Sequence, residues 1–374
     1  MQHEGVIMAV REFHDGAKDG LEALEPLDPE KIRTFGDLLS AMRKTAFGGR
    51  RVGEAFETLA AMIEDRECKV VLTLSGAMTI AKMGKIISTM IDRGMVQIIV
   101  STGALIAHGL SESVGKVHYR HPQGTPDEEL FRKGYNRVYD TLEMEANLNY
   151  VEHVVSQTLK RIDIDQPLSS SRMTRELGKT LAEEYEGAGI LKSAYLKQVP
   201  VYIPAFTDSE VGLDVGTWAM GRSIDMARSQ AKGEGDLAVL KALHQTCPQF
   251  NPYLDLHAYT EDILSAKRLG IFTIGGGVPR NWAQQVAPYI EIGNSRLGLN
   301  VKPPRFHYGV RICPEPDYWG GLSGCTYQEG ISWGKFVSPA EGGRFSEVLS
   351  DATVVWPLLL MGLLERAKAK TNAP

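Results

Sequence analysis

The chain has 374 residues, a formal net charge of −5 and a hydrophobic content of 43%. This length suffices for a large α/β domain, and the charge leaves no basic surplus for nucleic acid. The longest apolar stretch, residues 354–364, is far shorter than the roughly 20 residues that a membrane span needs. The four cysteines form no CxxC pair and the N-terminus is too charged for a signal peptide. We therefore expect a soluble, cytoplasmic protein without a nucleic-acid or membrane partner.

The N-terminal fifty residues predict a helical extension, because apolar side chains between Ile32 and Met42 recur at helical spacing. No linker, repeat or low-complexity segment divides the rest of the chain. We therefore expect an N-terminal helical arm over residues 1–50 and a single catalytic domain over residues 51–374.

Four apolar, β-branched runs are typical of buried strands, and each ends in glycine or small polar residues before a helix-like sequence. Because the runs are apolar on both faces, they predict central strands of a parallel sheet. Amphipathic stretches such as residues 79–93 are long enough to be crossover helices. The pattern predicts an α/β fold with a doubly wound, mostly parallel sheet. The four runs are residues 69–74, 96–100, 199–206 and 269–274.

Glycine and hydroxyl residues gather at the predicted strand ends, where open parallel sheets bind their ligands. Gly275, Gly276 and Gly277 follow the last run, and three glycines allow the backbone to approach a phosphate closely. They are similar to a dinucleotide-binding turn without being GxGxxG, and a plain strand-to-helix connection is the less favoured alternative. Thr102 and Gly103 follow the second run and can donate hydrogen bonds to a ribose or phosphate. Together these turns predict a nucleotide crevice.

Two titratable side chains stand near the same strand ends. Asp208 supplies an acid at the rim, or caps a helix N-terminus. His108 follows the Ser-Thr-Gly turn and can serve as a proton shuttle, or is an interior histidine with satisfied hydrogen bonds. The other histidines show no metal-ligand spacing with cysteines or carboxylates, so no metal site is predicted.

A loop over residues 318–336 carries five glycines and two tryptophans, a composition typical of a binding loop. Trp333 stands two residues before Lys335, so in an extended segment both side chains point to one side. A lysine held against an aromatic wall loses solvation, its pKa falls, and it can act as an imine-forming nucleophile. A solvated surface lysine is the alternative. Glu329 can orient Lys335 or an amine substrate, or merely cap a helix.

Residues 331–335 (ISWGK) resemble the active-site segment of the deoxyhypusine synthase family. ISWGK is short but uncommon, and its combination with GGGVPRN strengthens the resemblance, which extends across most of the chain. The other matching segments stand in family order and at family spacing: STGA (101–104), PAFTDSEVG (204–212), IGGGVPRN (274–281), WGGLSGCT (319–326) and SDATVVWPLL (350–359).

The resemblance implies a Rossmann-like domain that binds NAD and forms a homotetramer, with active sites between paired subunits. In family chemistry, NAD takes a hydride from spermidine, diaminopropane leaves, and the aminobutyl group passes as a lysine imine to an acceptor amine before reduction. By position Lys335 is that lysine, Trp333 is the wall beside the polyamine, and Glu329 is a substrate-side acid. The expected NAD contacts are Thr102, Gly103, Asp208, Gly275, Gly276, Gly277 and Asp351.

The sequence departs from the eukaryotic pattern of this family. His108 replaces a glutamate, Asn281 replaces a histidine, and Leu213 and Leu322 replace aspartates that contact the polyamine. Loss of acids matters because each buried ammonium of a polyamine needs a partner. The departures resemble the archaeal and bacterial branch of the family, and the neighbouring carboxylates Glu210 or Asp214 could compensate.

Three classes of function remain open at this point: a transferase with either of two acceptors, a regulatory protein and a dehydrogenase. A deoxyhypusine synthase-like transferase would use a protein lysine as acceptor, whereas a homospermidine synthase would use free putrescine. A non-catalytic NAD-binding regulatory protein or a plain dehydrogenase would keep the crevice, but neither needs a desolvated lysine. The intact Lys335, Trp333 and Glu329 favour the transferase.

Overall fold

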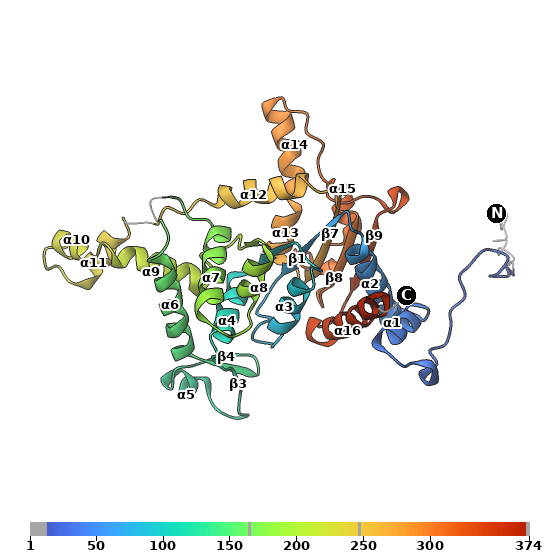
Figure 1. Ribbon diagram of the computed structural model, residues 1–374, viewed down its shortest axis with the longest axis horizontal. Helices are drawn as coiled ribbons and strands as arrows, with labels where there is room; N and C mark the ends of the chain where they lie inside the picture. The colour runs from blue at the N-terminus through green and yellow to red at the C-terminus, as the bar shows by residue number, and fades with distance from the viewer. Residues whose placement is uncertain (1–12, 164–165, 246–247, 372–374) are drawn as a thin grey trace, which may run out of the picture.

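The computed structural model describes residues 13–163, 166–245 and 248–371, and its centre is a parallel sheet of six strands (Figure 1). The strands lie in the order β6-β2-β1-β7-β8-β9, which in chain order is the 3-2-1-4-5-6 arrangement of a Rossmann fold. The predicted doubly wound parallel sheet is therefore confirmed. The strands are β1 (Cys68–Leu74), β2 (Ile98–Ser101), β6 (Val201–Tyr202), β7 (Arg268–Ile274), β8 (Tyr308–Ile312) and β9 (Arg344–Val348).

One face of the sheet packs against a large helical layer. Its apolar cluster joins Leu72 and Phe272 from the sheet to Leu39, Phe56 and Trp356 from the helices, all of them buried. The helices that contribute are α1 (Phe35–Arg43), α2 (Phe47–Glu64), α3 (Gly84–Asp92), α4 (Gly103–Ser113), α6 (Glu145–Leu159), α7 (Ser170–Glu184), α8 (Ile190–Lys197), α9 (Glu210–Gly221) and α16 (Ala352–Thr371).

A second apolar cluster covers the other face. Val71 and Ile271 point to it because neighbouring strand residues alternate between the two faces, and Tyr259 and Tyr327 pack on them. Both faces are thus covered, which explains why the central strands are apolar throughout. The helices on this face are α12 (Pro252–Leu264), α13 (Gly277–Gln284), α14 (Val286–Leu297) and α15 (Tyr327–Ser332).

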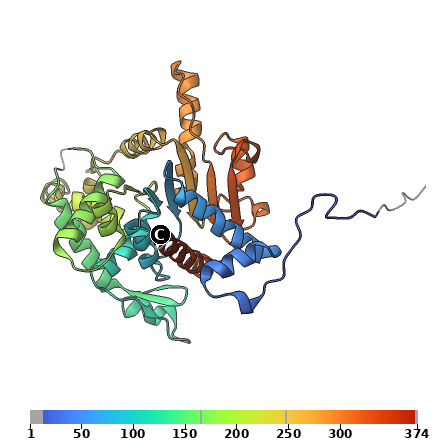
Figure 2. The same ribbon diagram turned by 45° about the vertical axis from the view of Figure 1, so that its right-hand side comes forward.

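Three segments extend from this body in Figure 1, and Figure 2 shows two of them, the chain before α1 and α14, from another side. The chain before α1 runs away from the sheet, α14 projects as a single helix, and α10 and α11 form a small projection beyond α9. A small antiparallel sheet lies beside α6. These further elements are α5 (Asp127–Arg132), α10 (Ile224–Gln230), α11 (Asp236–Leu243), β3 (Tyr119–Arg120), β4 (Tyr135–Val138) and β5 (Thr141–Met144).

Some predicted boundaries were wrong. The run at residues 199–206 forms a strand only over Val201–Tyr202. The helix expected over residues 79–93 begins at Gly84, because Lys82 adopts a left-handed φ of 63° that interrupts a helix. β8 and β9 were not predicted, since charged residues interrupt both.

The boundary predicted at residue 50 falls inside α2, which is continuous across it. Leu39, in the segment predicted to be an arm, is fully buried against α2 and α16. The division into an arm and a domain stays a prediction. Within the described part of the chain, no helix combines the length and apolar character that crossing a bilayer requires.

Trp356 should be a main stabilising side chain, since it is fully buried in α16. Its ring lies edge-on to that of Phe272, with 6.0 Å between the ring centroids. Trp356→Ala should lower the free energy of unfolding by about 3–5 kcal/mol, because it leaves a cavity in the larger cluster. The control Val354→Ala changes a residue of the same helix that is 62% exposed, and should stay within about 0.5 kcal/mol of the wild type. Denaturant unfolding measures both, and equal losses would contradict the assignment.

Candidate active site

The carboxyl ends of β1, β2 and β7 carry turns that contact one another. Leu74, the last residue of β1, pairs with neighbours that end β2 and β7, so the three strands stop at one level. The Ser75 hydroxyl donates a hydrogen bond to the Gly276 carbonyl, and the Thr102 hydroxyl donates to the Gly76 carbonyl at 2.9 Å. The turns predicted to form one crevice therefore lie side by side.

The glycine turn after β7 has a conformation that side chains would prevent. Gly275 and Gly277 have φ values of 78° and 59°, in the left-handed region. Gly276 is extended, but a Cβ on it would lie 2.4 Å from Cα of Ser323. Gly276 is therefore needed for the close approach of the loop that contains Ser323.

Arg280, in the helix that follows the glycine turn, is a buried cation at this site. The side chain is 2% exposed, and its Nη1 donates to the Cys325 carbonyl at 2.6 Å. Its Nε and Nη2 are buried without a hydrogen-bond partner among the described residues. Unpartnered guanidinium N–H groups favour an anionic ligand such as a phosphate. Arg280 was not predicted as a site residue, although it stands in the GGGVPRN segment.

Lys335 is held at the other end of the same loop. Its backbone N–H donates to the Gly330 carbonyl at 3.1 Å, and its carbonyl accepts from Phe306 N–H at 2.9 Å. Gly334, with a φ of 67°, makes the turn that separates Lys335 from Trp333. The Lys335 Nζ lies 5.8 Å from the centroid of the Trp333 ring. The lysine and the indole are thus neighbours as predicted, but through a tight turn and not an extended segment.

The surroundings of Lys335 favour the neutral amine. The residue is 9% exposed, and burial lowers the pKa of its amine. The charge of Arg280 lowers it further, while Cys325 and Glu329 act in the opposite direction. Trp333 is 62% exposed in the single chain, so this indole forms an open wall. Such a lysine can add to a carbonyl or imine carbon.

Glu329 lies in α15, close enough to influence Lys335 electrostatically. Thr326, and not Glu329, caps this helix, because the Thr326 hydroxyl accepts from Glu329 N–H at 3.1 Å. The loop predicted to be irregular therefore contains a short helix. The Glu329 carboxylate is left to face Cys325 and the lysine, which suits a substrate-side acid.

The remaining residues predicted to contact the cofactor follow strands at the same carboxyl end of the sheet. Gly103 begins α4 and backs onto Ser209, where a Cβ would lie 2.3 Å from the serine hydroxyl. Ser209, and not Asp208, caps α9, so the capping alternative for Asp208 was wrong. Asp351 follows β9 and accepts from Thr353 N–H at 2.8 Å. Asp208 and Asp351 follow the two outermost strands, so the width of the sheet separates them within one chain.

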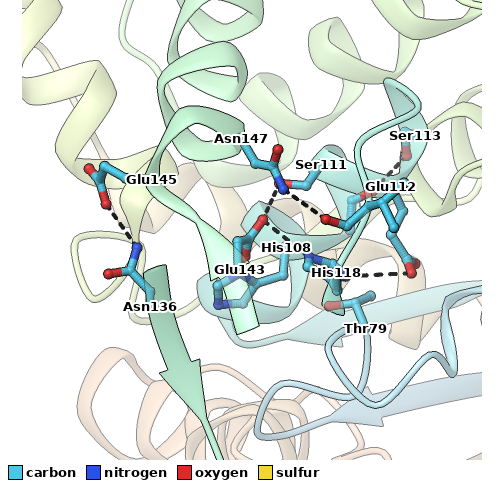
Figure 3. A network of polar contacts seen from close by, with 12 residues as sticks. Thr79, His108, Ser111, Glu112, Ser113, His118, Asn136, Glu143, Glu145 and Asn147 are labelled. Atoms are coloured by element: carbon cyan, nitrogen blue, oxygen red, sulfur yellow. Dashed lines mark hydrogen bonds and ion pairs between the residues drawn. The ribbon is translucent and has the colours of Figure 1, made fainter. Parts of the chain in front are cut away.

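His108 lies in a different group of polar side chains (Figure 3). Its Nδ1 contacts the Glu143 carboxylate, which also accepts from the Ser111 hydroxyl at 2.6 Å and lies beside His118. Burial alone would raise the pKa of Glu143, but the contacts with His108, His118 and Ser111 outweigh it and hold the pKa at about 2. No contact with Lys335 accompanies them among the described residues. The proton-shuttle role of His108 stays a prediction.

Lys335 should become reactive at a lower pH than free lysine, whose pKa is about 10.4. The depressed pKa means that the neutral amine accumulates earlier as the pH rises. Glu329→Gln should move the midpoint to lower pH still, because it removes a carboxylate that stabilises the ammonium form. Competitive acylation across pH, mapped by mass spectrometry, measures both midpoints. A wild-type midpoint at or above that of free lysine, or an upward shift in the variant, would contradict this environment.

Comparison with known proteins points to one family. The family model "Deoxyhypusine synthase" matches residues 37–363. "Probable deoxyhypusine synthase 2" of Methanosarcina mazei is 31% identical over 93% of this chain and 92% of that protein. "Deoxyhypusine synthase-like protein" of Elusimicrobium minutum is 28% identical over 90% of this chain and 82% of that protein.

The fold agrees as well. The crystal structure of a candidate deoxyhypusine synthase from Entamoeba histolytica superimposes with a TM-score of 0.55 at 13% identity, covering 91% of this chain and 97% of that one. The family model, which matches most of the chain, and the relative from Methanosarcina mazei carry the assignment. The chain belongs to the deoxyhypusine synthase family.

Proposed function

We propose that this protein is an NAD-dependent transferase that moves an aminobutyl group from a spermidine-like polyamine, through an imine on Lys335, to an acceptor amine. The observation that carries the proposal is Lys335 itself, buried, with a lowered pKa and against Trp333. A non-catalytic NAD-binding protein or a plain dehydrogenase would gain nothing from such a lysine. The proposed setting is the cytoplasm.

The strand-end residues fit NAD. Gly276 and Gly277 give close access to the backbone, the first N–H groups of α13 have no partner within the helix, and Arg280 keeps two unpartnered donors. Thr102 contributes a hydroxyl at the same edge. We propose that these residues hold NAD, with Gly103, Gly275, Asp208 and Asp351 as further contacts. When bound, NAD takes a hydride from the donor and returns it to the product, so that the transfer is redox-neutral overall.

Lys335 carries the group between donor and acceptor. Its neutral amine adds to the C=N carbon of the oxidised donor, the bond from that carbon to the diaminopropane nitrogen breaks, and diaminopropane leaves with the transferred proton. The acceptor amine then adds to the Lys335 imine and releases the lysine. In this proposal Glu329 binds the protonated amines, and the Trp333 ring is the wall beside the polyamine.

The far ammonium of the polyamine needs a carboxylate, and Leu213 and Leu322 cannot supply one. Both leucines are exposed, at 61% and 52%. Beside Leu213, burial together with the charges of Glu152 and Glu210 raises the pKa of Asp214 to about 6. A bound ammonium would relieve this repulsion, which supports a role for Glu210 and Asp214 in binding the polyamine.

We propose a homotetramer of paired subunits, in which a second chain completes the site. Trp319 and Trp333, in the loop that also carries Lys335, are 69% and 62% exposed, an unusual amount of indole for a surface that stays in water. The acceptor is a protein lysine in our first proposal. Free putrescine, the acceptor of a homospermidine synthase, is the alternative that product analysis decides.

Gly276→Val should abolish NAD binding, since the new side chain would collide with the Ser323 backbone and fill the approach to the turn. The control Gly216→Ala introduces a methyl group in α9, where nothing lies within 4 Å, and should bind NAD normally. Titration calorimetry measures both. Unchanged affinity in a folded Gly276→Val protein would remove the cofactor assignment.

Lys335→Arg should abolish aminobutyl transfer and keep NAD binding, because arginine keeps the charge but forms no imine. Lys116→Arg is a matched control, since Lys116 Nζ lies 4.0 Å from the Tyr150 ring centroid, and it should keep full activity. Borohydride added during turnover should trap the aminobutyl fragment on Lys335, as mapped by mass spectrometry. An adduct on another lysine, or wild-type transfer in Lys335→Arg, would refute the mechanism.

A further inference from the structure

Three side chains from separate segments meet in the buried cluster of Figure 3. His108 comes from α4, His118 from the segment before β3, and Glu143 from β5. Their side chains are 12%, 0% and 1% exposed, and one ligand atom from each lies within 4.8 Å of the others. We refer to His108, His118 and Glu143 as the histidine–glutamate cluster. Two imidazoles and a carboxylate are the protein ligands of several open zinc sites.

His118 supplies a second, independent observation. Its Nε2 is fully buried and has no hydrogen-bond partner among the described residues. It lies 3.1 Å from a Glu143 carboxylate oxygen but is not aligned for a hydrogen bond to it. A buried nitrogen whose contact with a carboxylate lacks hydrogen-bond geometry is poorly satisfied, and a cation between the imidazole and the carboxylate would satisfy both groups.

The outer contacts also suit a metal ion. The Ser111 hydroxyl donates to Glu143 at 2.6 Å, which fixes the carboxylate. The Glu112 carboxylate lies 3.9 Å from His118 Nδ1. Histidines that bind a metal through one nitrogen usually donate from the other to a carboxylate or carbonyl. Glu112 is placed to accept that hydrogen bond after a small movement.

The Lys82 ammonium competes with a metal ion for His118. Its Nζ lies 2.7 Å from His118 Nδ1 and 2.7 Å from Glu112. An ammonium at Nδ1 leaves the imidazole proton on Nε2, the atom that would have to bind the metal. Because the Lys82 side chain is 49% exposed, it can turn to solvent and leave Nδ1–H to Glu112.

We propose that the histidine–glutamate cluster binds one divalent cation of the zinc class, through His108, His118 and Glu143, in competition with the Lys82 ammonium. His108 is the most exposed of the three ligands, so the open coordination position lies on its side. A water molecule or an amine can occupy that position. A metal ligand cannot also shuttle protons, so this assignment replaces the proton-shuttle role of His108. The proposal does not depend on the transferase activity.

Calorimetry with Zn²⁺ on the chelator-treated full chain tests the site, and the ligand-field absorption of bound Co²⁺ reports its coordination geometry. We expect one equivalent per chain. His118→Gln and Glu143→Gln should weaken binding by more than about 100-fold, and Ser111→Ala by about 10-fold. Lys82→Met should tighten binding because it removes the competitor. The control His153→Gln changes an exposed histidine of α6 outside the cluster and should change nothing.

Failure to bind one equivalent of Zn²⁺ would overturn the proposal, as would wild-type affinity in both His118→Gln and Glu143→Gln. If these buried variants do not fold, the Zn²⁺ affinities of His108→Asn and Lys82→Met, at the more exposed positions, test the proposal. Opposite shifts, weaker in the first and tighter in the second, support the site. Unchanged affinity in both would overturn it.

Discussion

The parallel pairing of β1 with β7 is the constraint on which the site depends. Their register runs from Cys68 with Arg268 to Leu74 with Ile274, so both strands end together at the point where the strand order reverses. Chains that leave such a point diverge, which opens a crevice between them. The contact of Ser75 with the glycine turn, on the side of the site proposed to hold NAD, follows from this arrangement.

Two cations, Arg280 and Lys335, lie close enough to interact electrostatically, and only Lys335 can lose its charge. Arg280 stays protonated and ties α13 to the loop through the Cys325 carbonyl. Its field acts on Lys335, whose amine responds by releasing a proton more readily. The same buried arginine therefore keeps two donors without a partner among the described residues and lowers the pKa of the lysine, so changing it should disturb both properties.

The sequence predicted the parts of the fold that depend on local pattern. β1 and β7 were recognised because both faces of each strand are apolar, whereas β8 and β9 carry Arg311 and Glu347, an ion pair at 2.8 Å that conceals the strand pattern. Lys335 was predicted because Trp333 stands two residues before it and because the ISWGK segment resembles the active-site segment of the family. His118 and Glu143 could not be predicted as neighbours, because they meet only through the packing of the small antiparallel sheet beside α4.

The projecting α14 has a consequence for how stability is distributed. Only its first residues, Val286 and Ala287, are buried, while Ile292 and Leu297 are 46% and 73% exposed. A helix of this length is marginal in water without tertiary contacts. Its outer turns should therefore exchange their amide hydrogens rapidly in dilute solution, and in the proposed homotetramer a covering subunit would protect them as protein concentration rises, by mass action. Local order in this helix would then depend on concentration while the central sheet stays fully protected.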